Sequence, residues 1–350
     1  MSDSALRVVY LLNNYDASGA RDGRLAANHL FGTANPPQGW RTEMAPRMLH
    51  HVLKRIPFGV SLARFLWRVI GDPVQASWVA LQKKPEGSVV WIATQAVSIL
   101  PLVMRAMRVI RVPVFVLYHS ATIPILQLLC ARYADGVVVF SERTARELAL
   151  RWVKPERIRV LPWGPDLMWE PYTVANEVVE LDMVAFGKTH RDYESTIKAA
   201  QLLGLSMDIY SAGVRMSLRH GARLPDEHFE RLSNEAMIAR IKSARAVIIP
   251  VRGDAPAYGL TGLTELCDAI ACRIPVIMTR NSALPFDLEE CRVGAWISPD
   301  FGPVELARAI ELSQAARFEA FEELLAWWNE SEFSKGLFRF FDEAGVASHD

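Results

Sequence analysis

The segment from Ala246 to Asn281 constrains the fold of this chain more than any other. It begins with a short apolar run, Val247 to Ile249, which is typical of a buried strand. A loop rich in glycine and proline follows, and the next stretch, Gly262 to Cys272, has the composition of a helix. Pro275 to Met278 then predicts a second strand. A strand, a helix and a parallel strand form one crossover unit, so the segment predicts an α/β domain built on a parallel sheet.

Two acidic residues lie on this predicted helix, which is otherwise apolar enough to be buried. Glu265 and Asp268 are three residues apart and therefore share one face. Buried carboxylates need polar partners, and the glycine-flanked helix start suits an anion because free N–H groups point there. A phosphate at the helix start and ribose hydroxyls on an acid would explain both features. The alternative is that Glu265 merely caps the helix while Asp268 is half-exposed.

The residues from Gly262 to Ile277, which read GLTELCDAIACRIPVI, resemble the C-terminal-domain signature of glycosyltransferases with the GT-B fold, especially those of family 4. The resemblance implies an α/β protein with two Rossmann-like domains facing each other across a cleft. It also places the family's ribose-binding acid on Asp268. The phosphate-facing turn of the family falls on Gly262, Leu263 and Thr264.

The sequence departs from this signature at two positions. The family commonly has a second acid eight residues before the ribose-binding one, and this chain has Leu260 there. Asp254 or Glu265 could substitute for that acid, and we expect Glu265 in the donor site. The glycine that usually lies two residues before the proline is Arg273.

Two further segments extend the resemblance toward the N-terminus. Ala134 to Glu142 and Arg157 to Asp166 are similar to the end of the family's N-terminal domain, where a strand, a serine and a helix precede a closing G-x-D. Ser141 is the expected N-cap of that helix, a role that an ordinary strand-to-helix turn would also give it. Trp163 to Glu177 contains a glycine and two prolines and has no clear periodicity, so it is the best linker candidate.

These patterns predict a chain of three parts. Residues 1–165 form a Rossmann-like acceptor domain, residues 178–328 a Rossmann-like donor domain for the nucleotide sugar, and residues 329–350 a segment that packs back on the first domain. The final segment is rich in aromatic residues, which we expect to pack rather than to bind a ligand. Besides the crossover unit, apolar runs predict strands at Arg7–Leu12, Val89–Ala93, Val114–Tyr118, Gly136–Phe140, Ile158–Leu161, Leu181–Phe186 and Met207–Tyr210.

Basic residues follow the first predicted strand of the second half. Gly187, Lys188 and Arg191 match the glycine and basic residues that the family places on the loop facing the donor diphosphate. We expect Lys188 and Arg191 to be catalytic, since cations there would stabilise the charge that develops on the leaving nucleoside diphosphate. A solvated charged turn is the alternative.

A histidine, His119, directly follows the strand Val114–Tyr118. The family often has a histidine there that contacts the donor sugar, so the resemblance makes His119 a third catalytic candidate. A lone histidine at a strand end is otherwise more often a packing or capping residue.

Two regions of the first half are expected to shape the acceptor site. In the loop Asn13 to Gly23, Gly19 and Gly23 allow close backbone approach, and Arg21 could meet an anionic acceptor. Leu49 to Val69 interleaves basic residues with aromatic and aliphatic ones, which fits an interfacial segment on an anionic membrane. Amphipathic helices with their apolar face in the core are the alternative for that stretch.

Composition sets the remaining limits. The chain has 39 acidic and 39 basic residues among 350, so no global basic field favours nucleic acid as a partner. Its four cysteines show no metal-binding spacing and are expected to be reduced thiols. The start lacks the pattern of a signal peptide, and no apolar run is long enough to span a bilayer. We therefore expect a cytoplasmic protein, with peripheral contact at the inner membrane face as a further option.

The resulting expectation is a glycosyltransferase that moves a sugar from a nucleotide-sugar donor to a hydroxyl acceptor, which is a saccharide or a lipid-linked acceptor. The resemblance implies retention of the anomeric configuration. No acidic D-x-D-type motif lies in a convincing place, so we expect no metal and no cofactor, with Lys and Arg supplying positive charge instead. The alternatives are an epimerase or hydrolase acting on nucleotide sugars, or a protein of this fold that binds them without turnover.

Overall fold

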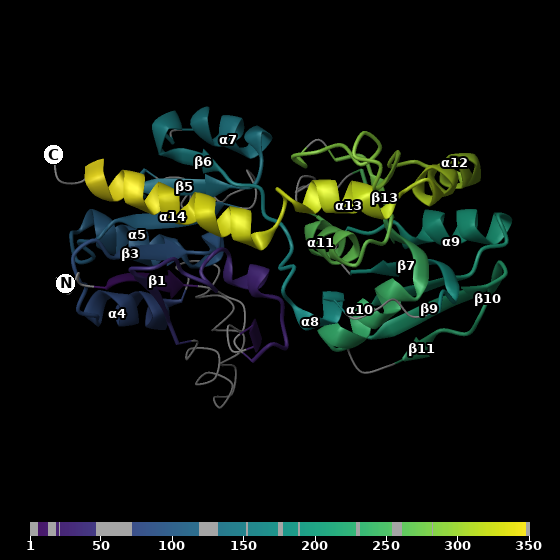
Figure 1. The fold of residues 1–350 in the computed structure, drawn as a ribbon, viewed down its shortest axis with the longest axis horizontal. Coiled ribbons are helices and arrows are strands. Elements are labelled where there is room, and N and C mark those ends of the chain that lie inside the picture. Colours follow the sequence, from purple (N-terminus) through teal and green to yellow (C-terminus); the bar gives the residue numbers. More distant parts are fainter. Residues whose placement is uncertain are drawn as a thin grey trace. The chain divides into compact units, whose positions relative to one another are not determined.

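The fold was determined from a computed structural model of the 350-residue chain (Figure 1). The structure describes residues 6–12, 19–20, 22–46, 72–118, 132–151, 153–173, 178–187, 190–228, 232–253, 261–281 and 283–347. The chain forms two compact units, and three chain segments contribute to the first. Unit 1 comprises Met1–Asp22, Ala27–Trp163 and Glu330–Asp350, and unit 2 comprises Gly23–Ala26 and Gly164–Asn329.

Unit 1 is built on a six-stranded sheet in which every pair of neighbours is parallel. The strand order reverses between β1 and β3, because the chain passes from β1 to one neighbour, β2, and then to the other. The strands lie in the order β2 (Trp40–Met44), β1 (Arg7–Leu12), β3 (Val89–Ile92), β4 (Val114–Tyr118), β5 (Gly136–Val139) and β6 (Ile158–Val160).

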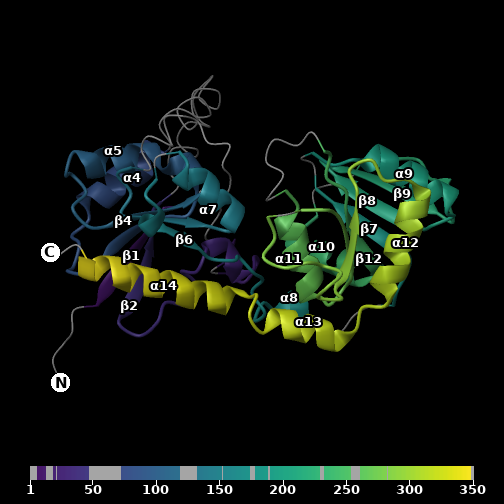
Figure 2. The same cartoon turned by 90° about the horizontal axis from the view of Figure 1, so that it is seen from above.

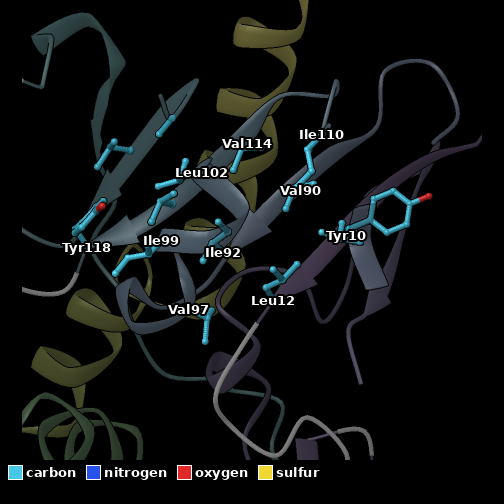
Figure 3. Packing of buried hydrophobic residues seen from close by; sticks show 14 of the residues in the cluster. Tyr10, Leu12, Val90, Ile92, Val97, Ile99, Leu102, Ile110, Val114 and Tyr118 are labelled. Carbon is cyan, nitrogen blue, oxygen red and sulfur yellow. The ribbon is translucent and has the colours of Figure 1, made fainter. Parts of the chain in front are cut away.

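Helices cover this sheet, and its strands β3, β4 and β5 are apolar throughout, as buried parallel strands usually are. Figure 3 shows Ile99 and Leu102 of α5 among the side chains that β3 and β4 direct into the core. The helices of unit 1 are η1 (Ala27–Leu30), α4 (Pro73–Leu81), η2 (Gln95–Val97), α5 (Ile99–Ala106), α7 (Glu142–Ala149), η3 (Pro155–Arg157) and α14 (Glu330–Ala347).

The start of α7 agrees with the sequence expectation. The Ser141 hydroxyl accepts a hydrogen bond from the Thr144 N–H at 3.2 Å, which satisfies one of the free donors of the first turn. The helix ends at Ala149.

Unit 2 contains an eight-stranded sheet whose central strands are parallel. The strands lie in the order β10 (Ala222–Arg223), β9 (Val214–Arg219), β8 (Met207–Ser211), β7 (Leu181–Phe186), β12 (Ala244–Ile249), β13 (Val276–Thr279) and β14 (Gly294–Ile297), and β11 (Glu227–His228) pairs with β9. The crossover unit is confirmed, since β12 and β13 are parallel and α11 (Leu263–Ala271) connects them.

The sequence did not predict the antiparallel strands at the edge of this sheet, which begin with β9. Ala212 and Gly213 join β8 to β9 with φ angles of 52° and 83°. Two successive positive φ angles are typical of a two-residue hairpin turn, so the chain reverses here instead of crossing over.

The helices of unit 2 lie on both faces of its sheet (Figure 2). Helices α9 and α12 pack on one face, where Ile197 and Leu306 join the core, and α10 and α11 lie on the other. Unit 2 also contains α8 and α13. Besides α11, the helices of this unit are α8 (Glu170–Thr173), α9 (Tyr193–Leu202), α10 (Asn234–Lys242), α12 (Pro303–Gln314) and α13 (Phe318–Leu325). No helix in the described ranges of either unit is long and apolar enough to cross a bilayer.

Helix α14 belongs to unit 1 and buries its aromatic face there. Phe341 is 1% exposed, and its ring lies 4.7 Å from that of Phe115, 5.9 Å from that of Trp91 and 6.1 Å from that of Trp40. One helical residue therefore contacts aromatic rings of three strands.

This packing predicts a large cost for truncating the ring. Phe341→Ala should lower the free energy of unfolding by about 3–5 kcal/mol, because it leaves a cavity between α14 and the sheet. Arg339→Ala is the matched control: it lies on the exposed side of the same helix and should change stability by less than about 0.5 kcal/mol. Urea unfolding of both variants measures the difference, and similar stabilities would contradict this role for Phe341.

Candidate functional site

The topology of unit 2 marks one place where a ligand is expected. From β7 the chain passes through α9 to β8 on one side, and later reaches β12 on the other side of β7. Open α/β sheets bind ligands in the crevice at the carboxyl ends of the strands where the order reverses in this way. The residues that follow β7 and β12 are therefore the candidates.

Backbone hydrogen bonds join the two loops at this edge. The Asp192 N–H donates to the Pro250 carbonyl at 2.9 Å, and the Arg252 N–H donates to the His190 carbonyl at 2.9 Å. The end of β13 contributes as well, because the Thr279 hydroxyl accepts from the Val251 N–H at 2.8 Å. The loops after the three strands thus form one connected frame.

Two glycines let the chain make close turns in this frame. Gly187 has a φ of 104°, and a Cβ added there would lie 2.5 Å from Glu265 Oε1 and 3.0 Å from Arg191 Nη2. Gly262 has a φ of 95°, and its Cβ would lie 2.5 Å from Ile249 Cγ2. Glycine is required at both positions, by conformation and by space.

An ion pair lies against these glycines. Arg191 Nη2 donates to Glu265 Oε1 at 2.6 Å, and the two side chains are 4% and 15% exposed. Arg191 Nε also donates to the Phe186 carbonyl, while the Tyr193 hydroxyl donates to the Gly187 carbonyl at 2.5 Å. Burial raises the pKa of Tyr193, so its hydroxyl keeps its proton and remains a donor.

Helix α11 begins at this ion pair with its amino end uncapped by a side chain. Its N-cap is Gly262, whose residue type has no side-chain acceptor to offer the first N–H groups. Such an end attracts anions through these donors and the helix dipole. The arrangement can hold a phosphate group beside Arg191.

Asp268 lies one turn further along α11 and is 5% exposed. Its Oδ1 accepts a hydrogen bond from the Tyr172 hydroxyl of α8 at 2.6 Å. The preceding residue of α8, Pro171, accepts through its carbonyl from the ammonium of Lys242 at 2.6 Å. Helix α8 is therefore joined by hydrogen bonds to both α10 and α11.

The environment of Asp268 disfavours its ionised form. Burial raises its pKa to about 7, the hydrogen bond from Tyr172 acts in the opposite direction, and the Glu265 carboxylate adds to the rise. Of the two acids on this helix, Glu265 is the more exposed and the one with an arginine partner.

The structure brings most of the predicted donor residues together. Gly187, Arg191 and Glu265 form the cluster around the start of α11, to which Gly262, Leu263 and Thr264 belong by position. The roles assigned to these residues, and to Asp268, stay predictions.

Four predicted residues, Lys188, His119, Arg21 and Asp254, lie outside the residues that the structure describes, as does the stretch Leu49 to Val69. Gly19 is buried in unit 1. Gly23 groups with unit 2, where its carbonyl accepts from the Trp169 indole N–H at 2.7 Å.

Sequence reasoning missed Tyr172, Tyr193 and Lys242. Tyr172 lies in the stretch assigned as a linker because it lacks periodicity, yet its side chain is buried. The available signal was its apolar character together with Trp169, whose ring lies 4.9 Å away. Lys242 ends a short helix, and nothing local to its sequence indicates that it is 3% exposed.

The raised pKa of Asp268 predicts a pH-dependent stability. An unfolded aspartate titrates at about 3.9, so the folded state retains this proton at pH values where the unfolded state has lost it. The stabilising effect is full below about pH 4 and is lost as pH rises toward 7. Between pH 5 and pH 8 the wild type should lose on the order of 2–3 kcal/mol relative to Asp268→Asn, which stays neutral and still accepts from Tyr172. Urea unfolding at both pH values tests this, and a pH-independent difference would contradict it.

No protein-family model and no curated protein matches this sequence. Solved structures do match it. The chain is similar to Alr3699/HepE of Anabaena in complex with UDP and glucose, at 13% identity and a TM-score of 0.59, covering 97% of this chain and 100% of that one. It is also similar to the apo form of the lipopolysaccharide outer core galactosyltransferase WaaB, at 12% identity and a TM-score of 0.56, covering 98% and 99%.

A third similar structure is a glycosyltransferase from Rickettsia africae, at 10% identity and a TM-score of 0.56, covering 97% and 98% of the two chains. These structures are GT-B glycosyltransferases, and identities this low carry the fold and not the activity. The fold class expected from the sequence is confirmed, and membership of family 4 stays a prediction. The chain has the GT-B fold, with one Rossmann-like sheet in each unit.

Proposed function

We propose that the protein is a glycosyltransferase that moves a sugar from a nucleotide-sugar donor to a hydroxyl acceptor. The observation that carries the proposal is the uncapped start of α11 beside Arg191 and Gly187, at the carboxyl edge where the strand order reverses. Similar structures over the full chain length support it, one of them crystallised with UDP-glucose.

The donor diphosphate lies, in this proposal, at the start of α11. The N–H groups of Leu263 and Thr264 donate to it, and Lys188, which the family resemblance assigns to the loop facing the diphosphate, adds positive charge. Arg191 adds positive charge to the same site while its guanidinium remains paired with Glu265. Stabilising the leaving diphosphate with fixed charges lowers the barrier, because that charge grows in the transition state. Arginine and lysine then take the electrostatic role that a metal ion has in other transferases, so transfer proceeds without metal.

The acid that binds the ribose hydroxyls is, in this proposal, Glu265. Glu265 is partly exposed and paired with an arginine, whereas Asp268 accepts a hydrogen bond from Tyr172. Asp268, the assignment made from the family resemblance, is the competing candidate. Both carboxylates lie on the same helix, so one experiment can separate them.

The acceptor side rests on the family resemblance. Transfer with retention, contact of His119 with the donor sugar and an acceptor near Gly19 and Arg21 are parts of the proposal that follow from it. A cytoplasmic location and a saccharide or lipid-linked acceptor complete the proposal.

Incubation with a panel of nucleotide sugars tests the function. Free nucleoside diphosphate should appear faster with a suitable acceptor than without one, and the sugar should appear on the acceptor. Release that is independent of every acceptor would indicate a hydrolase, and an altered nucleotide sugar without release would indicate an epimerase. A raised melting temperature without turnover would indicate a binding protein.

Lys188→Ala should weaken binding of a nucleoside diphosphate much more than binding of the uncharged nucleoside. Losing a charged hydrogen bond to phosphate costs about 1.5–3 kcal/mol, which is about tenfold or more in affinity. Arg191→Ala should show the same selectivity and should also lower turnover. Calorimetric titration measures the affinities, with Lys198→Ala as an exposed control on the following helix. Equal losses of affinity for the nucleoside and the nucleoside diphosphate would indicate that the loop containing Lys188 and Arg191 has only a structural role.

The acid that binds the ribose can be identified by testing variants of both acids with a nucleotide that lacks the 2′-hydroxyl. Wild type should bind the 2′-deoxynucleoside diphosphate about tenfold or more weaker than the ribonucleotide if a charged acceptor contacts that hydroxyl. Glu265→Gln should lose this discrimination, and Asp268→Asn should keep it. The opposite pattern would show that Asp268, and not Glu265, binds the ribose.

A further inference from the structure

The amino edge of the sheet in unit 1 has an unusual surface. Four strands that are consecutive in the sheet, β3, β4, β5 and β6, begin at this edge, and the segments that precede them lie side by side. These segments are residues 81–88, 107–113, 132–135 and 150–157. Each carries an exposed large apolar side chain, and the five such residues are Leu81, Met107, Val109, Tyr133 and Leu150.

Exposure at these positions is high. Leu81 and Leu150 are 84% and 85% exposed, Met107 is 62% exposed, and Tyr133 is 54% exposed. Apolar side chains scattered singly on a surface need no explanation, but a group gathered on one edge marks an interaction site.

The same segments are strongly basic, although the whole chain has no net charge. They contain eight basic residues and three acidic ones. The basic residues are Lys83, Lys84, Arg108, Arg111, Arg132, Arg151, Lys154 and Arg157, and the acidic residues are Glu86, Asp135 and Glu156. Asp135 is already bound to Arg105 at 2.8 Å and to the Val114 N–H, so it offsets little of this charge.

Hydrogen bonds hold the segments in place. Arg105 Nη1 donates to the Arg111 carbonyl at 2.7 Å, and Arg157 Nη1 donates to the Arg132 carbonyl at 3.1 Å. The Tyr10 hydroxyl donates to the Lys83 carbonyl at 2.7 Å. The apolar and basic side chains are therefore displayed by an ordered edge.

We propose that this amino edge, the residues named above, is a docking surface for an anionic lipid bilayer. Anionic headgroups complement the excess of basic residues, and arginine and lysine keep their charge at headgroup level while their stems lie against apolar neighbours. Leu81, Met107, Val109 and Leu150 enter the acyl boundary, and Tyr133 lies at the interface that tyrosine prefers. Nucleic acid would use the basic residues but would gain nothing from four exposed aliphatic side chains.

The surface lies opposite the carboxyl edge of the same sheet, where a Rossmann-like unit receives its ligand. Docking by the amino edge therefore leaves the ligand edge free. The inference does not depend on the proposed transferase activity.

Co-sedimentation with vesicles tests the proposal. The full-length protein should bind vesicles of phosphatidylcholine with phosphatidylglycerol at low salt, bind pure phosphatidylcholine far less, and release as salt rises. Arg108→Glu with Arg132→Glu should lower the partition coefficient by at least about tenfold. Met107→Ser with Leu150→Ser should lower the partition coefficient as well. At high salt this apolar variant should lower it more than the charge variant does, because salt screens the charges and the apolar contribution remains.

The matched control carries the same kinds of change on unit 2, Arg245→Glu with Val304→Ser, whose side chains are also exposed. It should bind vesicles as the wild type does, and circular dichroism should show every variant folded. Absence of vesicle binding at low salt would overturn the proposal. The proposal would also be overturned if Arg64→Glu with Arg68→Glu abolished vesicle binding while the amino-edge variants still bound. The stretch Leu49 to Val69 would then be the membrane segment. Binding of DNA that competes with the vesicles and survives Met107→Ser with Leu150→Ser would overturn it in favour of nucleic acid.

Discussion

The candidate site depends on one buried ion pair, between Arg191 and Glu265. Charges leave water at a cost of several kcal/mol each, and removing one partner of a buried pair typically costs about 3–5 kcal/mol. The pair therefore fixes its surroundings. It requires glycine at position 187, and it connects the loop after β7 to the first turn of α11, 74 residues away.

The same pair decides which chemistry this edge can support. A compensated arginine contributes less field to a phosphate than a lone one would, so the proposed site depends more on Lys188 and on the backbone N–H groups of α11. The Glu265 carboxylate, in turn, is held in place by the hydrogen bond from Arg191. The contrast with Asp268 is one of environment: two acids on one helix differ in exposure and partner, and burial moves the pKa of the inner one to about 7.

The sequence predicted those parts of the fold that local pattern determines. The unit β12–α11–β13 followed from apolar runs and glycine punctuation, and Ser141 followed from the residue types that cap helices. The hairpin from β8 to β9 was missed because Val214–Arg219 mixes arginine with apolar residues and its turn depends on Ala212 adopting a positive φ, which a non-glycine residue seldom does. The contact of Tyr172 with Asp268 spans 96 residues, and no local pattern encodes such a pairing.

Hydrogen exchange measured with and without a nucleoside diphosphate would show whether the start of α11 binds it. Bound nucleotide should slow exchange in peptides that cover residues 187–192 and 262–268, where the ligand and the ordered loops would protect backbone amides. Saturating binding that leaves both peptides unprotected, with protection elsewhere in the chain, would contradict the account.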